Sequence, residues 1–108
     1  MKLLMGMIAA LTVCLSTQAV AGGKVDMDAG RALAQKIGCL VCHGVDKKIV
    51  GPAFKDVAAK YKGKKVIDTL ATKAIKGGTG VWGPIPMPPN PVVKPEDVNT
   101  VVTWVLAL

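Results

Sequence analysis

Three side chains that can hold a prosthetic group lie within five residues of this chain, in the segment Cys39-Leu40-Val41-Cys42-His43. Residues three and four apart share one face of a helical turn, so both thiols and the imidazole can meet one ligand. The C-x-x-C-H spacing is typical of covalent haem attachment, in which two thiols bond to the porphyrin and the imidazole binds the iron. The segment therefore predicts one haem, attached through Cys39 and Cys42, with His43 as an iron ligand.

Two other kinds of site fit part of the same pattern. A thioredoxin-like C-x-x-C redox pair requires a strand-helix-strand context, and the surrounding sequence shows no convincing strand. A structural zinc site needs four ligands. After position 21 only Cys39, Cys42 and His43 offer thiol or imidazole groups, so a carboxylate would have to complete a zinc site. The five residues favour haem over both alternatives without excluding them.

A methionine could supply a second axial ligand to the iron. Met87 lies between Gly80 and Pro91, where five prolines in twelve residues prevent a helix or a central strand. Prolines fix backbone dihedral angles and reduce the entropy lost when a segment closes over a flat ligand. A buried methionine usually fills a core, and Met27, the other methionine after position 21, has no special setting. The proline-rich setting, 44 residues after His43, favours Met87 as a ligand.

The first 21 residues have the pattern of a secretory signal peptide. Lys2 precedes an apolar stretch over residues 3–15, and Ala19-Val20-Ala21 is an A-x-A cleavage site. The apolar stretch is too short to span a bilayer comfortably, which makes a retained anchor the weaker interpretation. We predict a signal peptide at 1–21, a mature domain at 22–108 and export to the periplasm. Export also fits haem attachment, which takes place outside the cytoplasm in bacteria.

The predicted mature chain is one small basic domain. Its 87 residues carry 13 Lys and Arg against 7 Asp and Glu, a net charge of +6. A domain of this size buries only about 60–65% of its unfolded surface and tends to need a staple, which a covalently bound macrocycle would provide. The net charge favours an acidic docking partner. Nucleic acid is a weaker interpretation, because the lysines are dispersed and the protein is exported.

The spacing of apolar residues, together with the positions of Gly and Pro, predicts an all-α domain with four helices. We expect helices over 28–37, 53–60 and 64–76, and a last helix that Pro95 opens. Asp28 is the expected N-cap of the first helix, and Gly38 and Gly77-Gly78 are the expected ends of the first and third. The expected inward residues are Leu33, Ile37, Leu40 and Val41, then Val66, Ile67, Leu70, Ala71, Ala74 and Ile75, and finally Val98, Val101, Val102, Val105 and Leu108.

Three segments give the chain a resemblance to a known family. Cys39 to His43, Gly51-Pro52-Ala53 and the run from Trp82 to Asn90 resemble small bacterial class I cytochromes c of the cytochrome c-551 type. The similarity extends from Gly30 to Trp104, and the proline-rich methionine segment is specific to this branch. The resemblance implies four helices around one haem c, with His43 and Met87 as the axial ligands.

The resemblance also implies supporting roles for other residues. Pro52 matches a proline whose carbonyl accepts the second ring N–H of the axial histidine. Trp82 matches a tryptophan that can donate to a haem propionate, and Asn90 an amide that can bond the methionine sulfur. Gly30 and Trp104 match a close contact between the first and last helices.

The function that the resemblance implies is a periplasmic monohaem electron carrier, not an enzyme. Its partners would be a quinol-oxidising complex upstream and a terminal oxidase, nitrite reductase or peroxidase downstream, with membrane contact only through such complexes. We expect a soluble monomer. Two alternatives stay open on sequence: an enzyme or sensor in which Met87 is a labile ligand, and a haem subunit fixed to a larger enzyme.

Overall fold

The computed structural model describes residues 25–108, so the predicted signal peptide at 1–21 lies outside the described residues. The described chain is all-α, as predicted, and its only β-type pairings are two isolated bridges. No helix within residues 25–108 has the length and apolar character needed to cross a membrane. The helical elements are α1 (Met27–Lys36), the 3-10 helix η1 (Cys39–Val41), α2 (Phe54–Lys60), α3 (Ile67–Lys76) and α4 (Pro95–Leu106).

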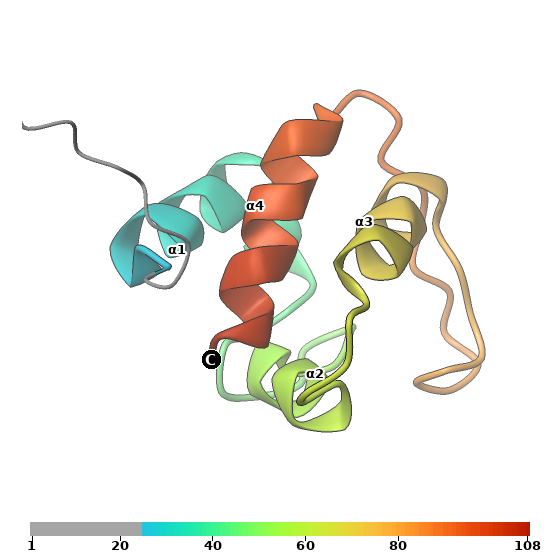
Figure 1. The fold of residues 1–108 in the computed structure, drawn as a ribbon. Helices are drawn as coiled ribbons and strands as arrows, with labels where there is room; N and C mark the ends of the chain where they lie inside the picture. Colours follow the sequence, from blue (N-terminus) through green and yellow to red (C-terminus); the bar gives the residue numbers. More distant parts are fainter. Residues whose placement is uncertain (1–24) are drawn as a thin grey trace, which may run out of the picture.

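Helix α4 is the centre of the fold (Figure 1). It contacts α1, α2 and α3, whereas no two of those three helices approach each other within 8 Å between Cα atoms. Pro95 stands at the start of α4, as predicted, where its missing N–H has no intrahelical partner to lose. The predicted apolar stripe of α4 is confirmed for Val98, Val101, Val102 and Val105, which are all buried. Leu108, also predicted to face inward, is half-buried beyond the end of the helix. The three outer helices are thus held together through α4.

The crossing of α1 and α4 depends on Gly30. A β-carbon at this position would lie only 2.3 Å from Cγ of Trp104, whose side chain is 1% exposed. Any residue other than glycine would therefore force the two helices apart. The predicted contact between Gly30 and Trp104 is confirmed.

The first helix differs slightly from the prediction. It begins at Met27, and its N-cap is Asp26 rather than Asp28, because the Asp26 carboxylate accepts a 2.9 Å hydrogen bond from the N–H of Ala29. Asp28 lies in the first turn, where its charge still favours the positive end of the helix dipole. Val41 was expected to face inward and is instead 75% exposed. Gly38, with a φ of +86°, breaks the helix before Val41 and turns that residue outward.

The second and third helices begin later than predicted. Ala53 is the N-cap of α2, so this helix starts one residue further on. Helix α3 starts at Ile67 rather than at Lys64, because Gly63 has a φ of +76° and Val66 is still non-helical. Ile67, expected to be buried, is 39% exposed at this helix start. Gly77 ends α3 as predicted, with a φ of +77°.

Candidate haem site

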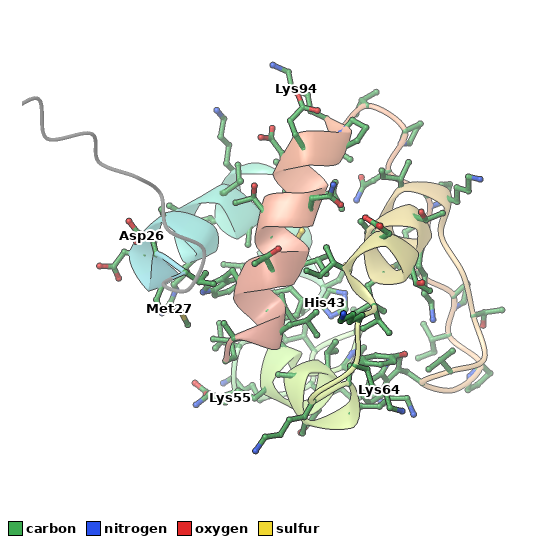
Figure 2. All side chains as sticks on the ribbon, in the orientation of Figure 1. Asp26, Met27, His43, Lys55, Lys64 and Lys94 are labelled. Atoms are coloured by element: carbon green, nitrogen blue, oxygen red, sulfur yellow. The ribbon has the colours of Figure 1, made fainter. Side chains whose placement is uncertain are left out.

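A cavity of about 350 Å³ lies beside α4, between α2, α3 and the proline-rich segment. Cys39, Cys42, His43 and Met87 all line it. The first three come from η1 and the two residues that follow it, whereas Met87 lies 44 residues after His43. In Figure 2 the labelled His43 lies inside the molecule, whereas Lys55, Lys64 and Lys94 point outward. Most of the lining is apolar, and the volume is typical of a pocket for an organic ligand. The structure thus brings the four predicted site residues to one cavity.

A hydrogen bond selects one tautomer of the neutral His43 imidazole. Its Nδ1 lies 2.8 Å from the carbonyl oxygen of Pro52. A carbonyl can only accept a hydrogen bond, so in the neutral ring the proton sits on Nδ1 and Nε2 keeps a free lone pair. This is the form in which an imidazole binds a metal through Nε2. The predicted partnership of Pro52 with the histidine ring is confirmed.

The two cysteines stand on one tight turn. The N–H groups of Cys42 and His43 both donate to the carbonyl of Cys39, at 3.3 and 3.1 Å, which keeps the thiols and the imidazole on adjoining positions. Both thiols are free and half-buried at the edge of the cavity. Burial raises the pKa of the Cys39 thiol, although a backbone hydrogen bond opposes this shift. The thiol therefore faces an apolar environment, which suits contact with a porphyrin edge.

Met87 is anchored through its backbone to the end of α3. Its N–H donates to the carbonyl of Gly78 at 2.7 Å, and its own carbonyl accepts from the N–H of Gly78 at 3.1 Å. The N–H of Asn90 donates to the carbonyl of Ile75 at 2.8 Å. Gly77 lets this segment pass close by, because a β-carbon there would lie 2.6 Å from the carbonyl oxygen of Met87. The half-buried Met87 side chain is therefore held at the cavity wall by more than its neighbouring prolines.

These residues fit a covalently attached haem. An apolar cavity of suitable size carries two thiols, an imidazole with a free Nε2 and a thioether. By contrast, residues 25–108 contain no group of three or more His, Cys, Asp or Glu side chains arranged to hold a bare metal ion. The donors that share the cavity match the needs of haem iron, which takes nitrogen and thioether axial ligands.

Comparison with known proteins gives the same answer. The sequence model of the cytochrome c family matches residues 27–108. The chain belongs to the cytochrome c family. It is 56% identical over 77 residues to cytochrome c-551 of Allochromatium vinosum, an alignment that covers 70% of this chain and 82% of that protein. It is 46% identical over 99 residues to cytochrome c-552 of Nitrosomonas europaea, covering 90% of this chain and 92% of that protein.

A solved structure shows that the fold is shared as well. The crystal structure of wild-type Nitrosomonas europaea cytochrome c552 has a TM-score of 0.70 and 48% identity to this chain, covering 72% of it and all but 2% of the other protein. The present protein is therefore a small c-type cytochrome in a family of electron carriers. Its single C-x-x-C-H motif attaches one haem c through Cys39 and Cys42.

Two further residues that the resemblance singled out, Trp82 and Asn90, also line the haem cavity of this cytochrome. The half-buried Lys73, to which the sequence analysis gave no role, lines it as well. Gly78 leaves room for Lys73, because a β-carbon at that glycine would lie 3.0 Å from the lysine Cε. Lys73 is therefore the basic side chain of α3 that reaches the cavity wall.

Two residues near the cytochrome site escaped the sequence analysis. Phe54 stacks on the His43 ring with centroids 4.8 Å apart and planes 17° apart. The ammonium group of Lys60 lies over the ring of Trp82, 5.5 Å from its centroid. The only feature of the sequence that could have drawn attention to Phe54 is that the chain contains no other phenylalanine. No spacing rule connects Phe54 to His43. The Lys60 contact joins α2 to a segment more than twenty residues later and has no local signature.

Proposed function

We propose that this cytochrome is a periplasmic one-electron carrier whose haem iron is bound by His43 and Met87. The observation that carries the proposal is the shared cavity, which the imidazole and the thioether line together with both haem-attaching thiols. The hydrogen bond to Pro52 leaves Nε2 of the neutral His43 ring available to bind the iron. When bound, the haem supplies a one-electron Fe(III)/Fe(II) couple, and a His/Met ligand pair gives such iron a raised reduction potential.

In this function the polypeptide fixes the positions of the two proposed ligands, the His43 imidazole and the Met87 thioether. The imidazole of His43 is fixed by the Pro52 carbonyl. The backbone of Met87 is fixed by two hydrogen bonds with the N–H and the carbonyl of Gly78. Fixed donors reduce the rearrangement needed when the iron changes charge. The same rigidity opposes the alternative of an enzyme or sensor with a labile ligand, because the backbone of Met87 stays paired with Gly78 and keeps the thioether at the cavity wall. The proposed function needs no side-chain acid, base or nucleophile.

The distribution of charge supports docking with acidic redox partners. Residues 46–76, which include α2 and α3, hold nine lysines and three aspartates. The rest of the described chain holds three basic and four acidic side chains. The positive charge is thus concentrated on the part of the protein that carries α2 and α3, and Lys48 and Lys73 of this part line the haem cavity. Such an asymmetry orients a charged partner and raises the association rate.

The proposed location and partners follow from the same function. We propose that residues 1–21 direct export, so that the haem is attached and the carrier works in the periplasm. The proposed donors are quinol-oxidising complexes. The proposed acceptors are terminal oxidases, nitrite reductases or peroxidases.

The ligation proposal is tested by comparing the two methionines of the domain. Ferric iron bound by a thioether has a weak near-infrared charge-transfer band. Met87→Ala should abolish this band and lower the reduction potential, because the thioether favours the ferrous state. Met27→Ala is the matched control, since Met27 is 40% exposed at the start of α1 and does not line the cavity. A band that persists in Met87→Ala would show that Met87 is not the ligand.

A further inference from the structure

Three neighbours restrain the imidazole ring of His43 from different sides. The Pro52 carbonyl holds Nδ1 at 2.8 Å. Gly51 lies over the Cε1 side of the ring, where an added β-carbon would be 2.5 Å from Cε1, 2.8 Å from Nδ1 and 3.0 Å from Nε2. Phe54 covers one face of the ring in a nearly parallel stack at 4.8 Å. The Pro52 contact acts on the edge of the imidazole, Gly51 leaves room for the ring because it has no side chain, and Phe54 is the only one of the three that covers a ring face with a side chain.

Phe54 is itself tightly held. It is 6% exposed, and its ring meets Trp104 edge to face, with centroids 5.6 Å apart and planes 83° apart. Trp104 in turn fills the crossing of α1 and α4 against Gly30. Aromatic pairs prefer such offset-stacked and edge-to-face arrangements, so each ring fixes the next. The orientation of the His43 ring is thus connected to the most tightly packed point of the fold.

We infer that Phe54 is a positioning residue that sets the plane of the His43 imidazole. A single hydrogen bond at Nδ1 fixes a direction but leaves the ring free to tilt about the line between Nδ1 and the Pro52 oxygen. A flat group pressed against the ring face removes this tilt. The inference rests on the proposed role of His43 as an iron ligand, and it adds a second partner to the one that fixes the tautomer.

The competing interpretation is that Phe54 only fills the core. The two interpretations differ in what they predict for the electronic structure of the iron. The principal g values of low-spin ferric haem in electron paramagnetic resonance depend on the orientation of the axial ligand planes. A positioning residue must change these values when its ring is removed, whereas loss of core packing elsewhere lowers stability and leaves them unchanged.

The test uses the ferric holoprotein and three variants. Phe54→Leu removes the aromatic face and should shift the principal g values while the iron stays low-spin. Phe54→Tyr keeps the face and should retain the wild-type values. Leu106→Ala is the matched packing control, because Leu106 packs against the cluster of Ala71, Val98 and Val102 on α3 and α4 and does not line the cavity. It should lower stability without shifting the g values.

Two outcomes overturn the inference: unchanged g values in Phe54→Leu, or an equal shift in Leu106→Ala. If Phe54→Leu does not accumulate with haem, the wild-type protein provides a second measurement. Phe54 is the only phenylalanine, so 4-fluorophenylalanine labels this position alone. A ring stacked on an iron ligand should show a large change in its fluorine chemical shift when the iron is oxidised. An unmoved signal would overturn the inference.

Failure of the ligation proposal would be seen separately. His43 is the only histidine of the chain, so 15N-histidine labels one imidazole. If the wild-type ferric protein shows no hyperfine coupling between the unpaired electron of the iron and the 15N of His43, then His43 does not bind the iron. If this coupling is present but Phe54→Leu leaves the g values unchanged, the ligation proposal stands and only the role inferred for Phe54 is contradicted.

Discussion

Replacing Gly77 with alanine should loosen Met87 without touching its side chain. Gly77 has a φ of +77° and a ψ of 176°, a conformation that costs residues other than glycine about 1–3 kcal/mol. An added β-carbon would also lie 2.6 Å from the carbonyl oxygen of Met87 and 2.9 Å from the nitrogen of Pro89. These are backbone atoms that cannot rotate away, so overpacking adds about 1–3 kcal/mol. The displacement acts directly on the pairing between Gly78 and Met87.

Gly83 provides the matched control in the same segment. Its φ is +111°, but a β-carbon there would meet no atom within 4 Å. Gly83→Ala therefore carries backbone strain without the collision. The difference between the two variants should be the overpacking cost of about 2 kcal/mol. If Met87 binds the iron as proposed, that difference corresponds to about a thirty-fold larger population of molecules in which the thioether is detached.

The assay follows the near-infrared band of the ferric holoprotein through a guanidinium titration, with far-ultraviolet circular dichroism recorded in parallel. In Gly77→Ala the band should disappear well before the helices unfold, and at a lower denaturant concentration than in Gly83→Ala. Equal midpoints for band loss in the two variants would refute the reasoning. That result would mean that the Met87 backbone yields to the added carbon at no cost.

Three further predictions concern folding, docking and the closure of the cavity. A Cys39→Ala, Cys42→Ala chain should be largely unfolded by circular dichroism, because α1, α2 and α3 approach α4 closely but not one another. A cooperative, fully helical apoprotein would contradict this. Electron-transfer rates with an acidic partner should fall as salt shortens the Debye length, about 10 Å at 0.1 M, and Lys47→Gln, Lys48→Gln should flatten that dependence without changing the optical spectrum. Salt-independent rates, unaltered in the double variant, would instead indicate docking through apolar residues. Lys60→Gln should lower the free energy of unfolding by about 0.5–1 kcal/mol through loss of the contacts of its ammonium group with the rings of Trp82 and Tyr61. The control Lys62→Gln removes another exposed charge, one for which the described structure shows no aromatic partner. Equal effects of the two substitutions would show that the aromatic contacts of Lys60 do not stabilise the fold.

The features that the sequence predicted well have local causes. The C-x-x-C-H turn places its three donors by spacing alone, and Pro95 and Gly77 mark helix ends through their own backbone preferences. The apolar stripe of α4 follows from helical periodicity. In each case the residues that decide the structure are neighbours in the chain.

The features that the sequence missed depend on distant contacts or on competing local signals. Asp26 and Asp28 are both acceptable caps by residue type, and only the hydrogen bond from the N–H of Ala29 identifies Asp26 as the cap. The turn at Gly63 delays α3 even though the lysines before Ile67 would tolerate a helix. The stack of Phe54 on His43 needs the whole arrangement of α2 against α4, which no short pattern encodes.

The packing of the core explains why the proposed ligand pair matters for stability as well as for electron transfer. One buried cluster joins Ala34, Phe54, Val101, Trp104 and Val105, and a second joins Ala71, Val98 and Val102. His43 stacks on Phe54 of the first cluster, whereas Met87 is paired with Gly78 next to α3, the helix that supplies Ala71 to the second. The two proposed iron ligands thus lie beside different clusters of the core, which α4 and Ile37 otherwise connect. Ligation by both would close the fold across the cavity, so weakening the Met87 bond should free α3 and the proline-rich segment before it disturbs α1 and α2.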